Sequence, residues 1–90
     1  MSVRRTVTIC NRRGLHARAS AKFVTLASGL PCEVQVEKEG SGSVTGTSIM
    51  GLMVLGAAMG DSITISASGD DATQVVNTLV ELVEAKFGED

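Results

Sequence analysis

Four short segments of this sequence alternate apolar and polar residues, and this pattern constrains the fold more than any other feature. The segments are Val3–Cys10, Glu33–Glu37, Ser43–Thr45 and Ser62–Ser68. In the last of them Ile63 and Ile65 alternate with serine and threonine, as in a strand with one buried and one solvated face. Glu39–Gly42 supplies a turn that makes the second and third segments a hairpin. The chain is therefore expected to form an antiparallel sheet that needs a cover on one side only.

A first helix is predicted over Ala17–Ser28 because apolar residues recur there at helical spacing. These residues are Ala17, Ala21, Val24 and Ala27, with Phe23 and Leu30 nearby. Gly29 follows, at a position where a left-handed residue commonly ends a helix. We expect the helix to bury this stripe and to end at a left-handed Gly29.

Two further helices are predicted downstream. A short one, Ile49–Leu55, follows Ser48, whose hydroxyl can accept a hydrogen bond from a free N–H of the first turn. The clearest helix starts near Ala72 and continues to about Phe87. Its apolar stripe contains Ala72, Val75, Val76, Leu79, Val83 and Phe87.

The order of these elements, βαββαβα, places the chain in the α+β class. Strands with one apolar face need a cover, and three helices on the same side of the sheet supply it. The chain has 90 residues, of which 43% are hydrophobic and 20% are charged. That length and composition predict one globular domain over residues 1–90, with a four-stranded antiparallel sheet covered on one face by three helices.

Charge is divided unevenly along the chain. Residues 1–32 contain six Arg or Lys and no acid, whereas all ten Asp and Glu lie from Glu33 onward with only two Lys. The first segment either faces an anionic partner or is a chance cluster of solvated side chains. A net charge of −2 and the lack of Trp and Tyr argue against nucleic acid as a partner.

Cysteine and histidine are too few and too scattered for a metal or redox site, so no cofactor is expected. Cys10 and Cys32 form no CxxC pair, and His16 is the single histidine. The N-terminus has no apolar signal core. The apolar part of the uncharged run, Ile49–Met59, is too short for a membrane span of ~20 residues. We expect a cytoplasmic protein that does not insert into membranes.

The segment Gly14-Leu15-His16-Ala17-Arg18 places the single histidine at the start of the first predicted helix, where its ring should project into solvent. Free backbone N–H groups there, including that of Ala17, attract an anion such as phosphate, and the Arg18 guanidinium can bind the same anion. A neutral imidazole is a nucleophile near pH 7, so His16 can carry a phosphoryl group. The alternatives are that His16 only caps the helix or titrates on the surface.

In two separate motifs the chain resembles the histidine-containing phosphocarrier proteins (HPr) of the bacterial phosphoenolpyruvate-dependent phosphotransferase system, including their nitrogen-related branch. The first motif is Gly14–Arg18 with Phe23 in the following helix, and the second is Ser48–Met53 with Leu55–Gly56. The resemblance covers essentially the whole chain. It implies an open-faced β-sandwich and a monomeric phosphoryl carrier, which is no enzyme because it is itself the substrate of its partners.

The resemblance also implies roles for single residues. His16 would accept phosphate at Nδ1 from phosphorylated enzyme I and pass it to an enzyme IIA domain, while Arg18 neutralises the phosphoryl group. Two positions depart from the family pattern. Ala19 stands where Pro is usual and restores a backbone N–H. Arg13 replaces a small polar residue and is expected to strengthen attraction to phosphate or to an acidic partner.

Ser48 has a sufficient structural role as a helix cap, and the resemblance adds a regulatory one. The matching serine in many relatives is phosphorylated by HPr kinase/phosphorylase, and a phosphate there would repel an acidic partner. The following helix holds more apolar residues than one face can bury, of which Leu52 and Leu55 are assigned to the core. The candidates for an exposed partner-docking patch are Ile49, Met50 and Met53.

Two other classes of protein share this topology. A ferredoxin-like small-molecule-binding regulatory module has the order βαββαβ, although such a domain is normally attached to an enzyme. A single-strand RNA-binding module needs aromatic residues on its strands, whereas Phe23 and Phe87 fall on predicted helices. Within the HPr family, Ser48–Gly51 favours a carrier that answers to the kinase, and Gly88–Asp90 is similar to the nitrogen-related branch. The sequence leaves both branches open.

Overall fold

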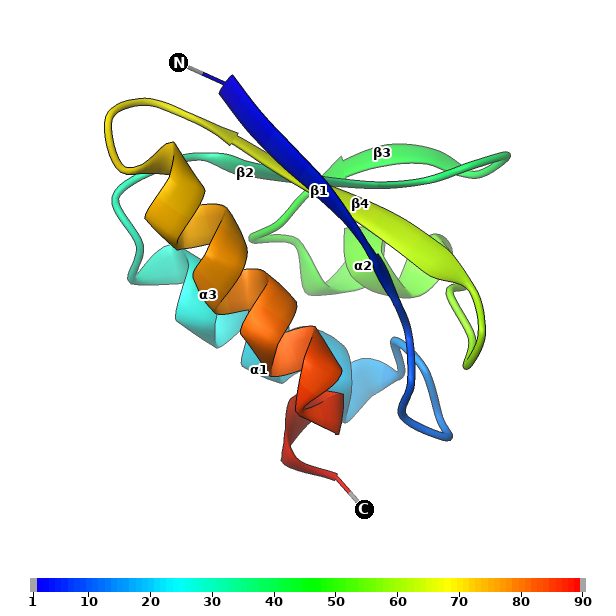
Figure 1. Cartoon of the computed structure of the whole chain (residues 1–90). Helices are drawn as coiled ribbons and strands as arrows, with labels where there is room; N and C mark the ends of the chain where they lie inside the picture. Colours follow the sequence, from blue (N-terminus) through cyan, green and yellow to red (C-terminus); the bar gives the residue numbers. More distant parts are fainter. Residues whose placement is uncertain (1, 90) are drawn as a thin grey trace.

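The four alternating segments form one antiparallel sheet in the computed structural model, which describes residues 2–89 (Figure 1). The strands are β1 (Ser2–Thr8), β2 (Val34–Lys38), β3 (Gly42–Thr45) and β4 (Ser62–Ser68). Their order in the sheet is β1-β4-β2-β3, so β4 pairs with β1 on one side and with β2 on the other. The predicted hairpin joins β2 to β3.

The two faces of the sheet differ as the alternation predicts. On the covered face, Val7 of β1 lies opposite Ile63 of β4, and both side chains are buried. On the other face, Thr6 lies opposite Thr64, and their hydroxyl oxygens are 2.9 Å apart. The apolar face therefore sets the register, since a slip by one residue would turn the buried side chains to solvent.

Three helices lie on the same side of the sheet, which confirms the predicted order βαββαβα (Figure 1). They are α1 (Ala17–Ser28), α2 (Ile49–Val54) and α3 (Ala72–Glu84). The predicted apolar stripe of the third helical segment is buried at every position: Ala72, Val75, Val76, Leu79, Val83 and Phe87. The core thus lies between the apolar face of the sheet and the helices, as in an open-faced sandwich.

Helix α1 has the predicted bounds, but the predicted buried stripe is partly wrong. The residues that it buries are Ala19, Ser20, Phe23 and Ala27, whereas Ala17 is exposed and Ala21 is only half-buried. Alanine hides little apolar area, so the large Phe23 ring decides which side of the helix faces the core. The prediction of a left-handed conformation at Gly29 is also wrong, because the φ of this residue is −91°. Its N–H bonds to the Leu26 carbonyl at 3.1 Å and closes the helix with a tighter last turn.

The last predicted helix does not reach Phe87. Helix α3 ends at Glu84, and a short 3₁₀ turn, η1 (Lys86–Gly88), follows it. Lys86 and Phe87 have φ values of 58° and 55°, in the left-handed region that residues other than glycine seldom adopt. This reversal puts the Phe87 ring into the core, where it is fully buried, and turns the following residues toward the start of α1.

Candidate functional site

The loop before α1 is fixed by contacts that leave no room for a larger residue at Gly14. Its φ is 61°, and a β-carbon added there would lie 2.3 Å from the Ala57 carbonyl oxygen. The same oxygen accepts a hydrogen bond from the N–H of Leu15 at 2.9 Å, and the Leu15 side chain is buried. The Asn11 side-chain amide donates to the Gly14 carbonyl at 2.9 Å. These contacts fix the loop backbone and thereby the position from which the His16 side chain projects.

His16 is the N-cap residue of α1 but does not cap it with its side chain. Its backbone is extended, and its carbonyl accepts the first helical hydrogen bond, from the Ser20 N–H at 2.9 Å. No described residue accepts a hydrogen bond from the N–H groups of Ala17, Arg18 or Ala19. The Ala19 N–H is the one that a Pro would lack. These free donors, at the positive end of the helix dipole, can bind an anion.

The His16 ring is held by Glu89, a residue that lies 73 positions away in the sequence. The expectation of a ring standing in solvent is wrong, because only 15% of the His16 side chain is exposed. Its Nε2 atom lies 2.5 Å from Glu89 Oε2. No described residue hydrogen-bonds Nδ1. Glu89 therefore occupies Nε2, whereas Nδ1 stays accessible for bond formation.

Glu89 is itself fixed by a second contact. The Asn11 side-chain amide donates to Glu89 Oε1 at 3.0 Å, and this hydrogen bond is the main cause that lowers the pKa of Glu89 below its usual 4.5. Partial burial opposes the shift, while the hydrogen bond with His16 and the positive charge of Arg13 add to it. A lowered pKa means that the carboxylate is charged at neutral pH and can only accept hydrogen bonds.

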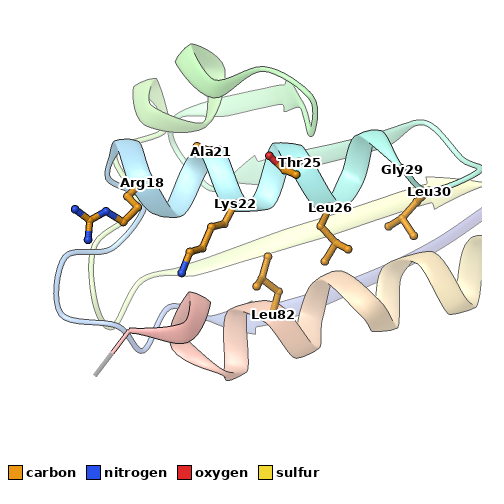
Figure 2. A pocket seen from close by; sticks show the side chains of 8 residues that line it. All are labelled: Arg18, Ala21, Lys22, Thr25, Leu26, Gly29, Leu30 and Leu82. Atoms are coloured by element: carbon orange, nitrogen blue, oxygen red, sulfur yellow. The ribbon is translucent and has the colours of Figure 1, made fainter.

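Arg18 lies in the first turn of α1, two residues after His16, and is exposed. Figure 2 shows its side chain extending from the start of the helix. No described residue hydrogen-bonds its guanidinium, so it is available to a bound anion. The predicted pair of His16 and Arg18 thus lies at one helix end.

The basic residues of the first third do not form a single surface. Arg4 pairs with Glu37 across the open face of the sheet at 2.5 Å, and Arg5 donates to the side chain of Asn77 on α3 at 2.7 Å. Four basic residues belong instead to the loop before α1 and to α1 itself: Arg12, Arg13, Arg18 and Lys22. Only this second group is close in sequence to His16.

Ser48 caps α2 as predicted, since its Oγ accepts a hydrogen bond from the Gly51 N–H at 3.0 Å. The assignment of Leu52 and Leu55 to the core is also confirmed, because both are fully buried. The three residues predicted to be exposed are exposed, and Met50 shows 71% of its surface. The sequence analysis missed two further exposed apolar residues: Val54, the last residue of α2, and Met59, which lies outside this helix. Val54 lies four residues after Met50 and so on the same side of α2, which a helical-wheel argument could have used.

An apolar groove of about 630 Å³ lies between α1 and α3 (Figure 2). Leu26, Leu30 and Leu82 line it, and Arg18 stands at one end. Of the site residues predicted from the sequence, only Arg18 lines this groove. Within residues 2–89 no cluster of three His, Cys, Asp or Glu side chains is arranged to hold a metal ion. None of the described helices has the length and apolar character needed to cross a membrane.

Known proteins match this chain over nearly its whole length. The family model described as "PTS HPr component phosphorylation site" matches residues 3–85. The phosphocarrier protein HPr of Pseudomonas aeruginosa is 42% identical over 83 residues, which are 92% of each chain. The phosphocarrier protein NPr of Shewanella violacea is 41% identical over 85 residues, which are 94% of this chain and 92% of the relative.

A solved structure agrees with the sequence matches. The crystal structure of HPr-C-His from Thermoanaerobacter tengcongensis superposes with a TM-score of 0.90 at 43% sequence identity, and the match covers 98% of both chains. Both the fold and the sequence therefore point to the same group of proteins.

Proposed function

Because the chain belongs to the HPr family, it is a phosphocarrier of the phosphotransferase system and not a catalytic enzyme, and we propose that His16 carries its phosphoryl group. The observation that supports this role most directly is the His16 ring itself. Its Nε2 atom is engaged by Glu89, whereas Nδ1 has no partner among the described residues. A neutral imidazole has one nitrogen with a free electron pair, and that nitrogen is the nucleophile.

The transfer is a substitution at phosphorus. The Nδ1 electron pair forms a bond to the phosphorus atom of the donor, phosphorylated enzyme I, while the bond from phosphorus to the donor breaks and its electrons stay with the donor. The reverse substitution passes the phosphoryl group to an enzyme IIA domain. The protein holds one phosphoryl group between the two steps and forms no other product.

The start of α1 supplies the charge that a phosphoryl dianion requires. The free N–H groups of Ala17, Arg18 and Ala19 are the hydrogen-bond donors, and the Arg18 guanidinium is the mobile cation. Donors that are already in place do not have to reorganise when charge develops on the phosphoryl oxygens. Ala17 and Arg18 are therefore the proposed phosphate-binding residues.

The exposed apolar surface of α2 is the proposed docking patch for both partners. It is formed by Ile49, Met50 and Met53. Methionine side chains adapt to differently shaped partners, which suits a carrier that contacts at least two proteins. If this role holds, Met50→Ala weakens binding to enzyme I, measured by titration calorimetry, and the matched control Met59→Ala outside α2 does not.

Ser48 is the proposed regulatory site, phosphorylated by HPr kinase/phosphorylase. A phosphate on its Oγ would add about −1.5 to −2 charge at the start of α2, where helix N–H groups tolerate it. The same charge would oppose an acidic partner that docks on the neighbouring patch. Regulation then acts on association and leaves the fold intact.

The decisive experiment for the carrier role is incubation with enzyme I and labelled phosphoenolpyruvate. Wild type should acquire acid-labile, alkali-stable label, the signature of phosphohistidine, and His16→Ala should acquire none. Arg18→Ala should be labelled about tenfold more slowly. Thr25→Ala, an exposed substitution further along α1, is the matched control and should behave as wild type. Acid-labile label on His16→Ala would contradict the proposal.

The regulatory role needs a separate assay with HPr kinase and ATP. Acid-stable label should appear on wild type and disappear in Ser48→Ala, whereas the neighbouring control Thr47→Ala should keep it. Ser48→Asp should accept phosphate from enzyme I more slowly than wild type, since the added charge stands beside the docking patch. Equal rates for Ser48→Asp and wild type would contradict the charge mechanism.

Two questions from the sequence have different outcomes. Family membership excludes the ferredoxin-like regulatory module as the function of this chain. The choice between a sugar-uptake carrier and a nitrogen-related carrier stays open, because an HPr and an NPr relative are 42% and 41% identical to it. The monomeric state stays a prediction.

A further inference from the structure

The segment after α3 adopts a backbone conformation that needs an explanation. Lys86 and Phe87 are consecutive residues with positive φ, at 58° and 55°. Neither is glycine, asparagine or aspartate, so both are held in the left-handed region against their own preference. Strain of this kind persists only where surrounding contacts enforce it, and it commonly accompanies a functional constraint.

Three contacts enforce the turn. The Phe87 ring is fully buried in the core. The backbone carbonyl of Phe87 accepts a hydrogen bond from Lys22 Nζ at 2.7 Å. Figure 2 shows the Lys22 side chain reaching from α1 toward this turn. Beyond the turn, Asn11 holds one carboxylate oxygen of Glu89 at 3.0 Å. The result of all three is that the other oxygen of Glu89 meets the His16 ring.

We propose that Glu89 is a positioning residue of the carrier site, which accepts the Nε2 proton of His16 and thereby keeps the electron pair on Nδ1. The inference rests on the proposed function, since it assumes that His16 is the phosphorylated residue. A neutral imidazole carries a single N–H, on one nitrogen or the other. A charged carboxylate can only accept, so the nitrogen that faces Glu89 must be the one that carries the proton.

Glu89 has a second effect once the phosphoryl group arrives. The Nδ1 electron pair then forms the bond to phosphorus, and Nε2 keeps its proton, so the ring becomes a phosphorylated imidazolium with one positive charge. The Glu89 carboxylate, 2.5 Å from Nε2, stabilises that charge. A protonated ring is also the better leaving group in the next transfer, since it departs as a neutral imidazole.

The surroundings favour this role over a merely structural one. Only 18% of the Glu89 side chain is exposed, and both of its oxygens have assigned partners, Asn11 and His16. The contact also joins residues from opposite ends of the chain at the nucleophile itself. If Glu89 only fastened the segment after α3, its contact with Asn11 would suffice.

The test measures the His16 tautomer directly by ¹⁵N NMR, at a pH where the ring is neutral. In wild type the Nε2–H form should dominate. In Glu89→Ala the ratio of the Nε2–H form to the Nδ1–H form should fall by about tenfold, which is the effect of losing one charge-assisted hydrogen bond. Glu84→Gln removes the same charge from an exposed position on α3 and should leave the ratio unchanged.

A third variant removes the charge but keeps one acceptor. Glu89→Gln has a single side-chain oxygen, for which the Asn11 amide and the Nε2 proton of His16 compete, so its tautomer ratio should fall less than that of Glu89→Ala. It loses the negative charge, so transfer from enzyme I should slow by about tenfold, as after loss of other partners that orient a reacting group. Glu89→Ala should be impaired in both measurements, and Glu84→Gln in neither.

The outcomes distinguish this inference from the proposed function. If His16→Ala still acquires acid-labile label, the carrier role on His16 fails and the inference fails with it. If His16→Ala acquires none but Glu89→Ala keeps the wild-type tautomer ratio, the carrier role survives and the positioning role is wrong.

Discussion

Helices α1 and α2 begin in opposite ways. Ser48, the N-cap of α2, accepts a hydrogen bond from the Gly51 N–H at 3.0 Å. The side chain of His16, the N-cap of α1, accepts none from the backbone, and its ring contacts Glu89. The start of α2 is stabilised by its own cap, whereas the start of α1 keeps its N–H donors free for an anion.

The difference shows that an uncapped helix start must be ordered by something other than its cap. For α1 this is the preceding loop, in which Gly14 packs against Ala57 and the Leu15 side chain enters the core. The stabilising contacts lie on one side of His16 and the free donors on the other. The contacts that stabilise the loop and the N–H groups that are free to bind an anion therefore belong to adjacent residues.

The largest effect is expected from the loop on which α1 depends. Gly14→Ala places a β-carbon 2.3 Å from the Ala57 oxygen at a residue with positive φ, and should lower the free energy of unfolding by about 3 kcal/mol. Gly40→Ala is the control, because Gly40 also has positive φ but nothing lies within 4 Å of its β-carbon position. It should cost about 1 kcal/mol. Denaturant unfolding measures both, and equal costs would contradict the role of this close contact.

The cap of α2 should contribute less than the loop does. Ser48→Ala removes the acceptor for the Gly51 N–H and should lower the free energy of unfolding by about 1 kcal/mol. Ser48→Asp offers another acceptor and should retain most of the wild-type value. If urea denaturation gives Ser48→Ala the stability of wild type, the contrast between the two helix starts loses its energetic basis.

The difference between the two helix starts can be tested by giving α1 a serine N-cap like that of α2. His16→Ser and His16→Ala both lose the ring and its contact with Glu89, so they differ only in the hydroxyl. His16→Ser should be the more stable of the two by about 0.5 kcal/mol, since its oxygen can accept an N–H of the first turn. Thermal unfolding compares them. A more stable His16→Ala would mean that these donors are already satisfied.

The smallest expected effect is a change in acid stability. The pKa of Glu89 in the folded protein lies below its usual 4.5, mainly because Asn11 donates to it. Its contribution is therefore fully present above about pH 4.5 and is lost as the pH falls through the lower, folded-state pKa. The difference in stability between wild type and Glu89→Gln should shrink over that acidic range. A difference that is constant from pH 7 to pH 2 would contradict the assignment.

The sequence was sufficient for those parts of the fold that depend on local pattern. Alternating residues identify β4 with its bounds, and Ser48 identifies the start of α2 because capping involves residues three positions apart. The buried side of α1 was predicted less well. Its alanines lie on several sides of the helix, so their spacing does not say which side the Phe23 ring turns toward the core.

Glu89 could not be found from the sequence as a partner of His16. The two residues are 73 positions apart, and their contact depends on positive φ at Lys86 and Phe87. Neither residue type signals such a turn, since lysine and phenylalanine fit equally well in a helix that continues. The helical stripe to Phe87 was correct as a pattern of burial and wrong as a description of the backbone.

The link from Lys22 to the Phe87 carbonyl has a practical consequence for anyone who labels this protein. If Glu89 orients the His16 ring as proposed, a fluorophore or affinity tag attached behind Glu89 would disturb the turn that holds the carboxylate against the imidazole, and would change the kinetics that it is meant to report. Figure 1 shows the start of β1 at the opposite end of the molecule from η1. Fusions in front of Ser2 are therefore the safer design.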